Sequence, residues 1–211
     1  MTGDGGKPVG ELLSAMTPPT NTRERLINTS LELFYRQGFH AVGLDQVIAE
    51  VGVTKTTFYN HFESKDELIV EAITRRDAWE FETWNRRVDE LSGGDPYKAL
   101  LVFFDVLNEW FNHPDFLGCI FVNAAAEFPS PHDPIHQAAA NHKRVTIEAI
   151  AQLADAAGLT DPDALAEKLM VLLDGAITLR QVTQNNHAAI AAKQIAEMLL
   201  KAHEPDEPPS E

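Results

Sequence analysis

Cysteine is almost absent from this chain of 211 residues: Cys119 stands alone, so no disulfide can form within the chain. Long hydrophobic runs are missing too, and nothing approaches the roughly 20 apolar residues that span a bilayer. The amino-terminal segment MTGDGGKPVGE lacks the charged-then-apolar pattern of a secretory signal. These absences argue against disulfide-stapled and membrane-spanning proteins, and they lead us to expect a cytoplasmic protein.

Positive charge is also scarce. The chain carries 17 Lys and Arg against 32 Asp and Glu, which gives a formal net charge of −15. The imbalance is uneven, because residues 1–66 hold six basic and eight acidic side chains, whereas residues 67–211 hold eleven and twenty-four. This charge argues against a purely electrostatic, non-specific DNA binder, but the first third of the chain is close to neutral.

Alternating patterns typical of strands are missing, and apolar residues recur at helical spacing, so we predict an all-α fold. Gly and Pro breaks divide the chain into about nine helices. Their predicted ranges are 21–37, 44–51, 55–62, 65–91, 96–112, 116–128, 134–157, 162–184 and 188–203. The Gly- and Pro-rich residues 1–19 and the acidic, Pro-rich residues 204–211 are expected to be disordered tails.

Two of the predicted helices, 44–51 and 55–62, are short and are joined by the tight turn Gly52-Val53-Thr54. This is the pattern of a helix-turn-helix unit, in which the second helix enters the major groove with its amino-terminal residues at base edges. Thr54 is the expected cap of that second helix. Val53 and Phe58 are expected to point inward, which leaves the polar side of the helix for phosphates and bases.

The stretch from Phe34 to Leu68, FYRQGFHAVGLDQVIAEVGVTKTTFYNHFESKDEL, resembles the DNA-binding domain of the TetR (tetracycline repressor) family. The residues that carry the resemblance are Phe34, Gly38-Phe39, Gly52-Val53-Thr54, Tyr59, His61-Phe62 and Ser64-Lys65. It extends from about Arg23 to Leu68, and the rest of the chain fits the family in helix count and placement. The resemblance implies a three-helix DNA-binding domain over residues 20–66 and a helical ligand-binding and dimerisation domain over residues 67–203.

The resemblance also assigns roles to individual residues of the second short helix and its surroundings. The residues expected to face bases are Lys55, Thr56, Thr57 and Asn60. Those expected to grip phosphates are Thr57, Tyr59, His61 and Lys65. The family commonly has Ser or Thr as the cap of the helix predicted over 44–51. This chain has Gly43 there instead, which brings no hydroxyl. Since residues 20–66 hold five basic and six acidic side chains, we expect a modest dependence of DNA affinity on salt.

The last two long helices, 162–184 and 188–203, are the candidates for a homodimer interface. The first is apolar around much of its circumference, so it must be covered on more than one side. The second supplies small residues that permit close helix approach. We expect a four-helix interface between two subunits, and the alternative is that both helices are internal core.

An aromatic-rich group precedes these helices, and in the TetR family the corresponding region encloses an inducer pocket. The resemblance therefore implies a site for an apolar or aromatic small molecule. The candidate ligand-binding residues are Trp84, Phe103, Phe104, Leu107, Trp110, Phe111, Phe121, Asn123, His142 and Gln181. For each of them the alternative is an ordinary role in the core.

Other chemistry finds little support in the sequence. Cys119 lies among apolar residues with no Lys or Arg nearby, so it is expected to be inert. His132 and His136 have a helical metal-ligand spacing, but Pro131 and Pro134 interrupt the segment, and we expect no metal or other cofactor. Since no nucleophile elbow, phosphate loop or informative carboxylate pair occurs, we do not expect an enzyme.

The sequence therefore predicts a TetR-like transcriptional regulator, a repressor that a small ligand releases from a palindromic operator. The alternative is a helical small-molecule-binding or catalytic protein in which the helix-turn-helix is vestigial.

Overall fold

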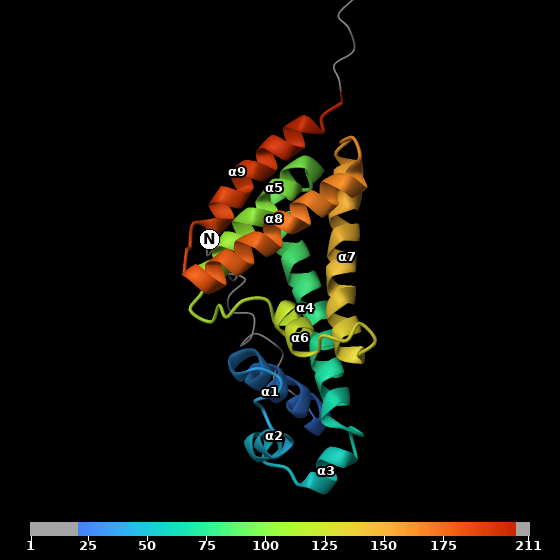
Figure 1. Cartoon of the computed structure of the whole chain (residues 1–211). Coiled ribbons are helices and arrows are strands. Elements are labelled where there is room, and N and C mark those ends of the chain that lie inside the picture. Colours follow the sequence, from blue (N-terminus) through green and yellow to red (C-terminus); the bar gives the residue numbers. More distant parts are fainter. Residues whose placement is uncertain (1–20, 206–211) are drawn as a thin grey trace, which may run out of the picture. The chain divides into compact units, whose positions relative to one another are not determined.

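The structure is a computed structural model that describes residues 21–205, and within that range it contains nine α-helices and no strand (Figure 1). The predicted all-α fold is confirmed. The helices are α1 (Thr22–Gln37), α2 (Leu44–Val51), α3 (Lys55–Tyr59), α4 (Lys65–Ser92), α5 (Pro96–Phe111), α6 (Ile120–Glu127), α7 (Pro134–Ala156), α8 (Pro162–Thr183) and α9 (Ala188–Ala202). The tail predicted over 1–19, and residues 206–211 of the second tail, lie outside the described residues.

Two helices are shorter than the sequence predicts. Helix α3 ends at Tyr59 because the N–H of His61 turns back to the carbonyl of Phe58 (2.9 Å), a tighter turn than the α-helix makes. Helix α6 begins at Ile120 instead of residue 116, because Gly118 has φ +94°. That backbone conformation cannot continue a helix. The apolar pattern before Ile120 gave no sign of this break.

Local capping residues set the limits of the helices around the turn at residues 52–54. Thr54 caps α3 as predicted, since its hydroxyl oxygen accepts from the N–H of Thr57 (3.1 Å). Gly52 ends α2 in the left-handed conformation, with φ +72°. Ser64 accepts from the N–H of Glu67 (3.1 Å) at the start of α4, but the Glu67 carboxylate accepts from the N–H of Glu63 (2.5 Å). The Glu67 carboxylate therefore binds the residue before the Ser64 cap rather than Ser64 itself.

The described residues form two compact units. The amino-terminal unit comprises residues 21–82 and 119–142, and the carboxyl-terminal unit comprises residues 83–118 and 143–205. Helices α4 and α7 each pass from one unit into the other. These units are defined by contacts between backbone segments. The predicted boundary at residue 66 instead separates a DNA-binding from a ligand-binding and dimerisation domain, and it stays a prediction.

The amino-terminal unit has an aromatic core beneath α1, α2 and α3. Its fully buried aromatic side chains include Phe34, Phe39, Phe58 and Phe62. Phe34 stacks on Phe39 with 5.2 Å between ring centroids, and Phe58 stacks on Phe62 at 5.7 Å. The Arg25 guanidinium of α1 donates to the carbonyl of Val51 at the end of α2. The three helices are therefore fixed by packing, and α1 and α2 also by this hydrogen bond.

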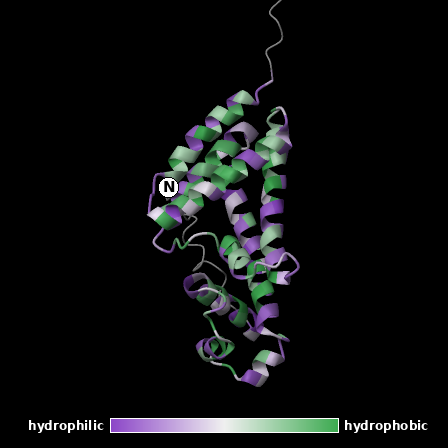
Figure 2. Ribbon diagram, viewed as in Figure 1, coloured by the Kyte–Doolittle hydropathy of each residue, from purple (hydrophilic) through white to green (hydrophobic). Residues whose placement is uncertain are grey.

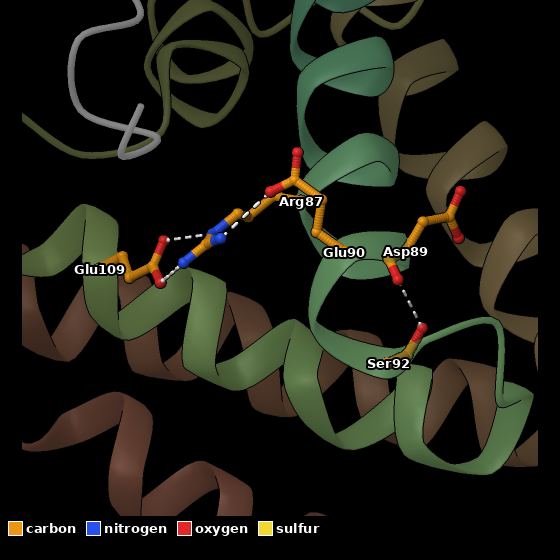
Figure 3. A network of polar contacts seen from close by, with 5 residues as sticks. All are labelled: Arg87, Asp89, Glu90, Ser92 and Glu109. Carbon is orange, nitrogen blue, oxygen red and sulfur yellow. Dashed lines mark hydrogen bonds and ion pairs between the residues drawn. The ribbon is translucent and has the colours of Figure 1, made fainter. Parts of the chain in front are cut away.

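In the carboxyl-terminal unit, α9 packs along α5 and α8 (Figure 1). The end of α4 is joined to α5 by Arg87, which donates from Nε and Nη2 to the two carboxylate oxygens of Glu109 (3.1 and 2.7 Å) and from Nη1 to Glu90 (3.1 Å) (Figure 3). The hydrogen bonds to Glu109, and then to Glu90, raise the pKa of the Arg87 guanidinium above its usual value. None of the helices in the described part has the length and hydropathy to cross a membrane.

Candidate nucleic-acid interface

Helix α3 separates its side chains into a buried and an exposed side. Phe58 is 0% exposed and holds the helix against the aromatic core. Lys55, Thr56 and Asn60 are exposed on the other side. Tyr59 is 51% exposed although it is aromatic, so its hydroxyl lies in solvent. This short helix therefore presents a cation, a hydroxyl, an amide and a phenol to whatever approaches it.

Weak contacts hold some of these polar groups. The hydroxyls of Thr54 and Thr57 lie 2.8 Å apart, and the Lys55 ammonium lies 3.5 Å from the carboxylate of Asp45 on α2. Both members of the second pair are largely solvated, and such pairs contribute little to stability. A phosphate or a base edge could therefore replace these contacts at low cost.

Lys65, the first residue of α4, makes a contact that the sequence did not reveal. Its ammonium donates to the backbone carbonyl of Phe39 (2.6 Å) and lies 5.9 Å from the centroid of the Phe34 ring. Burial lowers the pKa of Lys65, and the carboxylates of Asp66 and Glu127 oppose that shift. Because an ammonium has three N–H groups, the bond to Phe39 leaves donors for a phosphate.

The structure places the seven predicted DNA contacts together in the amino-terminal unit. Five lie on α3 or its carboxyl-terminal cap, and His61 and Lys65 follow directly, both half-buried. Gly43 caps α2 without any side-chain hydrogen bond, as its missing hydroxyl predicts. The roles of the seven residues as base or phosphate ligands stay predictions.

The predicted ligand-binding residues fall in both units. Those of the carboxyl-terminal unit are Trp84, Phe103, Phe104, Leu107, Trp110, Phe111 and Gln181. Those of the amino-terminal unit are Phe121, Asn123 and His142.

Aromatic rings of α4 and α5 form one cluster in the carboxyl-terminal unit. Trp84 lies 5.6 Å from Phe103 and 6.2 Å from Trp110, between ring centroids. Phe116 is not among the predicted ligand residues. It packs edge-on against Trp110 at 4.7 Å, and the guanidinium of Arg180 lies above its ring at 4.9 Å. Phe104 and Leu107 are also buried residues of α5.

Two other predicted residues have specific structural partners. The Gln181 side chain packs against Gly118, where an added Cβ would lie only 2.3 Å from its carboxamide. In the amino-terminal unit, the His142 ring lies flat on Phe121 with centroids 3.6 Å apart, and its Nδ1 lies 2.7 Å from a carboxylate oxygen of Asp77. Asn123 is half-buried on α6. Ligand binding by these residues remains a prediction.

The remaining candidates from the sequence are Cys119, His132 and His136. Cys119 is buried, at the amino-terminal cap of α6. The Nδ1 atom of His136 lies 2.8 Å from the carbonyl oxygen of Phe128. Among residues 21–205, no group of three His, Cys, Asp or Glu side chains is placed to hold a metal ion.

The amino-terminal helices and the long carboxyl-terminal helices both match known families. The family described as "Bacterial regulatory proteins, tetR family" matches residues 26–72, and the family described as "Tetracyclin repressor-like, C-terminal domain" matches residues 96–196. The chain belongs to the TetR family of transcriptional regulators. The predicted family and its regulatory function are confirmed.

Individual relatives of this TetR-family chain match it over most of its length or over about half of it. It is 24% identical to the HTH-type transcriptional regulator YjdC of Escherichia coli over 181 residues, which are 85% of this chain and 93% of that protein. It is 32% identical to the HTH-type transcriptional repressor NemR of Escherichia coli over 111 residues, 51% of this chain and 54% of that one. A crystal structure of a TetR-family regulator from Streptomyces coelicolor superposes with a TM-score of 0.76 at 28% identity, covering 87% of this chain and 96% of that chain.

Proposed function

We propose that this regulator binds a palindromic DNA operator as a homodimer and represses transcription until a small apolar or aromatic molecule releases it. The observation that carries the proposal is the division of α3 into a buried and a solvated side. Phe58 anchors the helix, while Lys55 and Thr56 are exposed at its amino-terminal end, which a helix-turn-helix directs to base edges, and Asn60 is exposed one turn later. The relative NemR is named a transcriptional repressor, which favours repression over activation.

The chemistry of the exposed side chains suggests a division of labour on DNA. Asn60 is the candidate for base recognition, since an Asn amide can bond to adenine in the major groove with two hydrogen bonds. Lys55, Thr56 and Thr57 are proposed to contact neighbouring base edges. Tyr59, His61 and Lys65 are proposed to contact phosphates, with Thr57 taking part in both roles. Phosphate contacts fix the position of the protein on DNA, whereas base contacts select the sequence.

The proposed homodimer uses apolar side chains that α8 and α9 leave exposed. Val171, Val182 and Met198 are 71%, 75% and 72% exposed. Hydrophobic residues recur along both helices (Figure 2). The exposed residues of the proposed interface are Val171, Leu179 and Val182 on α8 with Ile190, Ile195 and Met198 on α9. Monomeric proteins seldom leave large contiguous apolar patches in water, so a second copy of the chain is the proposed cover.

The proposed ligand acts on the spacing of the two recognition helices in the dimer. Half-sites one turn of B-DNA apart require a spacing of about 34–36 Å. Helix α4 is the proposed connection, because it carries Lys65 at its start and Trp84 of the aromatic cluster in its later turns. To move the population from 99:1 to 1:99, the ligand must bind the released state about 10⁴-fold more tightly.

Fluorescence anisotropy with a palindromic duplex from upstream of the protein's own gene tests the proposal. We expect saturable binding of one dimer per palindrome, and loss of that binding when one half-site is scrambled. If folded dimeric protein bound no duplex at low salt, the proposal would be wrong. The alternative, a helical small-molecule-binding or catalytic protein with a vestigial helix-turn-helix, would then be favoured.

A further inference from the structure

The turn between α1 and α2 is held by a carboxylate from a distant part of the chain. Glu127, the last residue of α6, accepts from the backbone N–H of Phe39 with one oxygen (2.9 Å) and from the N–H of His40 with the other (2.6 Å). Hydrogen bonds to an ionised acceptor are about twice as strong as those between neutral groups. One side chain therefore binds two consecutive peptide groups of the turn.

The same turn is bound from its other side by the first residue of α4. The carbonyl of Phe39 accepts from the Lys65 ammonium (2.6 Å), while the N–H of Phe39 donates to Glu127. Phe39 thus lies between an anion and a cation that belong to two different helices. All three residues are in the amino-terminal unit.

The backbone of the turn is shaped to fit the carboxylate. Gly38 has φ +90°, and a Cβ added there would come within 3.0 Å of a Glu127 carboxylate oxygen. The neighbouring Phe128 adds apolar contacts, with its ring edge-on to Phe39 (6.1 Å) and to His40 (4.7 Å). A side chain at position 38 would press on the carboxylate, so the glycine serves both the turn and the close approach of Glu127.

From this geometry we propose that Glu127 is a positioning residue for DNA binding. Its carboxylate fixes the turn at residues 38–40, and through the carbonyl of Phe39 it fixes the ammonium of Lys65 at the start of α4. Four residues separate this start from Asn60, the carboxyl-terminal cap of α3. The inference rests on the proposed function, because it concerns how the same surface binds DNA, and it adds a residue outside the segment 20–66 expected to form the DNA-binding domain.

The sign of the expected effect separates positioning from simple electrostatics. A carboxylate near the DNA-binding surface repels phosphates, so removing its charge should strengthen DNA binding if charge alone matters. If Glu127 positions the turn and Lys65, its removal must weaken operator binding instead. Glu32 provides a matched control, because it is an exposed carboxylate of α1 whose ionic partner within residues 21–205 is Arg36, one turn away (3.4 Å).

The experiment measures the dissociation constants of Glu127→Ala, Glu127→Gln and Glu32→Gln by fluorescence anisotropy, with the palindromic duplex and an unrelated duplex at several salt concentrations. For Glu127→Ala we expect a loss of operator affinity of about tenfold or more. Glu127→Gln retains an acceptor oxygen and should lie between this variant and the wild type. Glu32→Gln should bind as tightly as the wild type or more tightly. The salt slope of Glu127→Ala should fall toward that of Lys65→Met, since Glu127 acts through the phosphate contact proposed for Lys65.

A double-mutant cycle distinguishes positioning from a general loss of stability. The effects of Glu127→Ala and Lys65→Met on operator affinity should be less than additive, because both residues act through the Phe39 peptide. The effects of Glu127→Ala and Lys55→Met should add. Circular dichroism and a stoichiometric titration of the active fraction ensure that only folded protein is compared.

Unchanged or tighter operator binding by Glu127→Ala, or additivity with Lys65→Met, would overturn the inference. Should Glu127→Ala fail to fold, Glu127→Gln carries the same comparison, and affinity equal to that of Glu32→Gln would overturn it. Absence of duplex binding by the wild-type protein would instead remove the proposed function itself, and that result is distinct from any difference between variants.

Discussion

Helix α3 of the amino-terminal unit and helices α8 and α9 of the carboxyl-terminal unit differ in the side chains that they expose. On α3 the large apolar residue, Phe58, is buried and polar residues such as Lys55 and Asn60 face solvent. On α8 and α9 apolar residues are also buried, but others, such as Val182 and Met198, lie in solvent. A surface that ends in hydrogen-bonding groups suits a polar partner, whereas an apolar surface is stable only when it is covered. The contrast fits a duplex at one end of the chain and a second subunit at the other.

Charge changes along the chain at a different boundary, near residue 66. Residues 20–66 hold five basic and six acidic side chains, while residues 67–211 hold eleven and twenty-four. Acidic side chains repel nucleic acid over distances up to about the Debye length. The acidity of the long carboxyl-terminal part therefore disfavours DNA contacts anywhere except at the nearly neutral helix-turn-helix. Specific polar groups, rather than net charge, must supply the affinity.

The largest effect is expected when the buried side chain of α3 is removed. Phe58→Ala deletes a fully buried ring that packs on Phe62, and we expect it to lower the free energy of unfolding by about 3–5 kcal/mol. Urea unfolding monitored by circular dichroism measures the change. Tyr59→Phe, which removes only a solvated hydroxyl, should alter stability by less than about 0.5 kcal/mol. Equal stability of the two variants would contradict the assignment of a buried and a solvated side.

A single charged substitution tests whether the exposed apolar residues of α8 form the dimer interface. Val182→Asp places a carboxylate in the proposed dimer interface. An unpaired charge buried there costs about 3 kcal/mol or more. We therefore expect the dimer dissociation constant to rise at least about 100-fold. Analytical ultracentrifugation over a concentration series measures it. Gln152→Asp adds the same charge at an exposed polar position of α7 and should leave the dimer intact. A wild-type monomer, or equal dimerisation of the two variants, would show that α8 does not form the interface.

A third substitution tests which exposed residue of α3 or its cap recognises bases and which contacts phosphates. Asn60→Ala should cost about 1–3 kcal/mol of operator affinity and relax the preference at one base position, because its amide is proposed to read a base. Tyr59→Phe should weaken binding to all duplexes alike, since a phosphate contact carries no sequence information. Binding measurements on a set of duplexes with single base changes separate the two patterns. An unchanged preference profile for Asn60→Ala would remove its proposed role.

The features that could be predicted from sequence are those fixed by neighbouring residues. Thr54 caps α3 with a bond that spans three residues, and Gly52 ends α2 with its own backbone, so both are visible in a short window. The burial of Phe58 follows from helical spacing in the same way. The helix-turn-helix was therefore recognisable together with its limits, apart from the early end of α3.

The features that were missed depend on residues that are distant in the sequence. Glu127 follows three alanines, and nothing in that pattern indicates that its carboxylate binds the turn 88 residues earlier. The bond of Lys65 to Phe39 spans 26 residues and is equally hidden. The break at Gly118 is accompanied by the packing of Gln181 from α8. Such tertiary contacts decide local structure only after the chain has folded, so local pattern cannot reveal them.

The smallest expected effects compare an ion pair of each unit. Arg87 and Glu109 form two hydrogen bonds in a partly buried setting, whereas Lys55 and Asp45 lie 3.5 Å apart in solvent. We expect Glu109→Gln to lower the free energy of unfolding by about 1 kcal/mol, with a decrease of about 2–4 °C in the melting temperature. Differential scanning calorimetry measures this shift.

Asp45→Asn is the counterpart in the amino-terminal unit, and it should leave the melting temperature within about 1 °C of the wild type because exposed pairs contribute little. It should nevertheless tighten DNA binding by about two- to fivefold, since it removes a negative charge beside Lys55 and frees the ammonium. Anisotropy titrations at low and high salt would reveal the gain, which should shrink as salt is added. A lower melting temperature with unchanged DNA affinity would mean that this pair, like Arg87 and Glu109, serves the fold and not the partner.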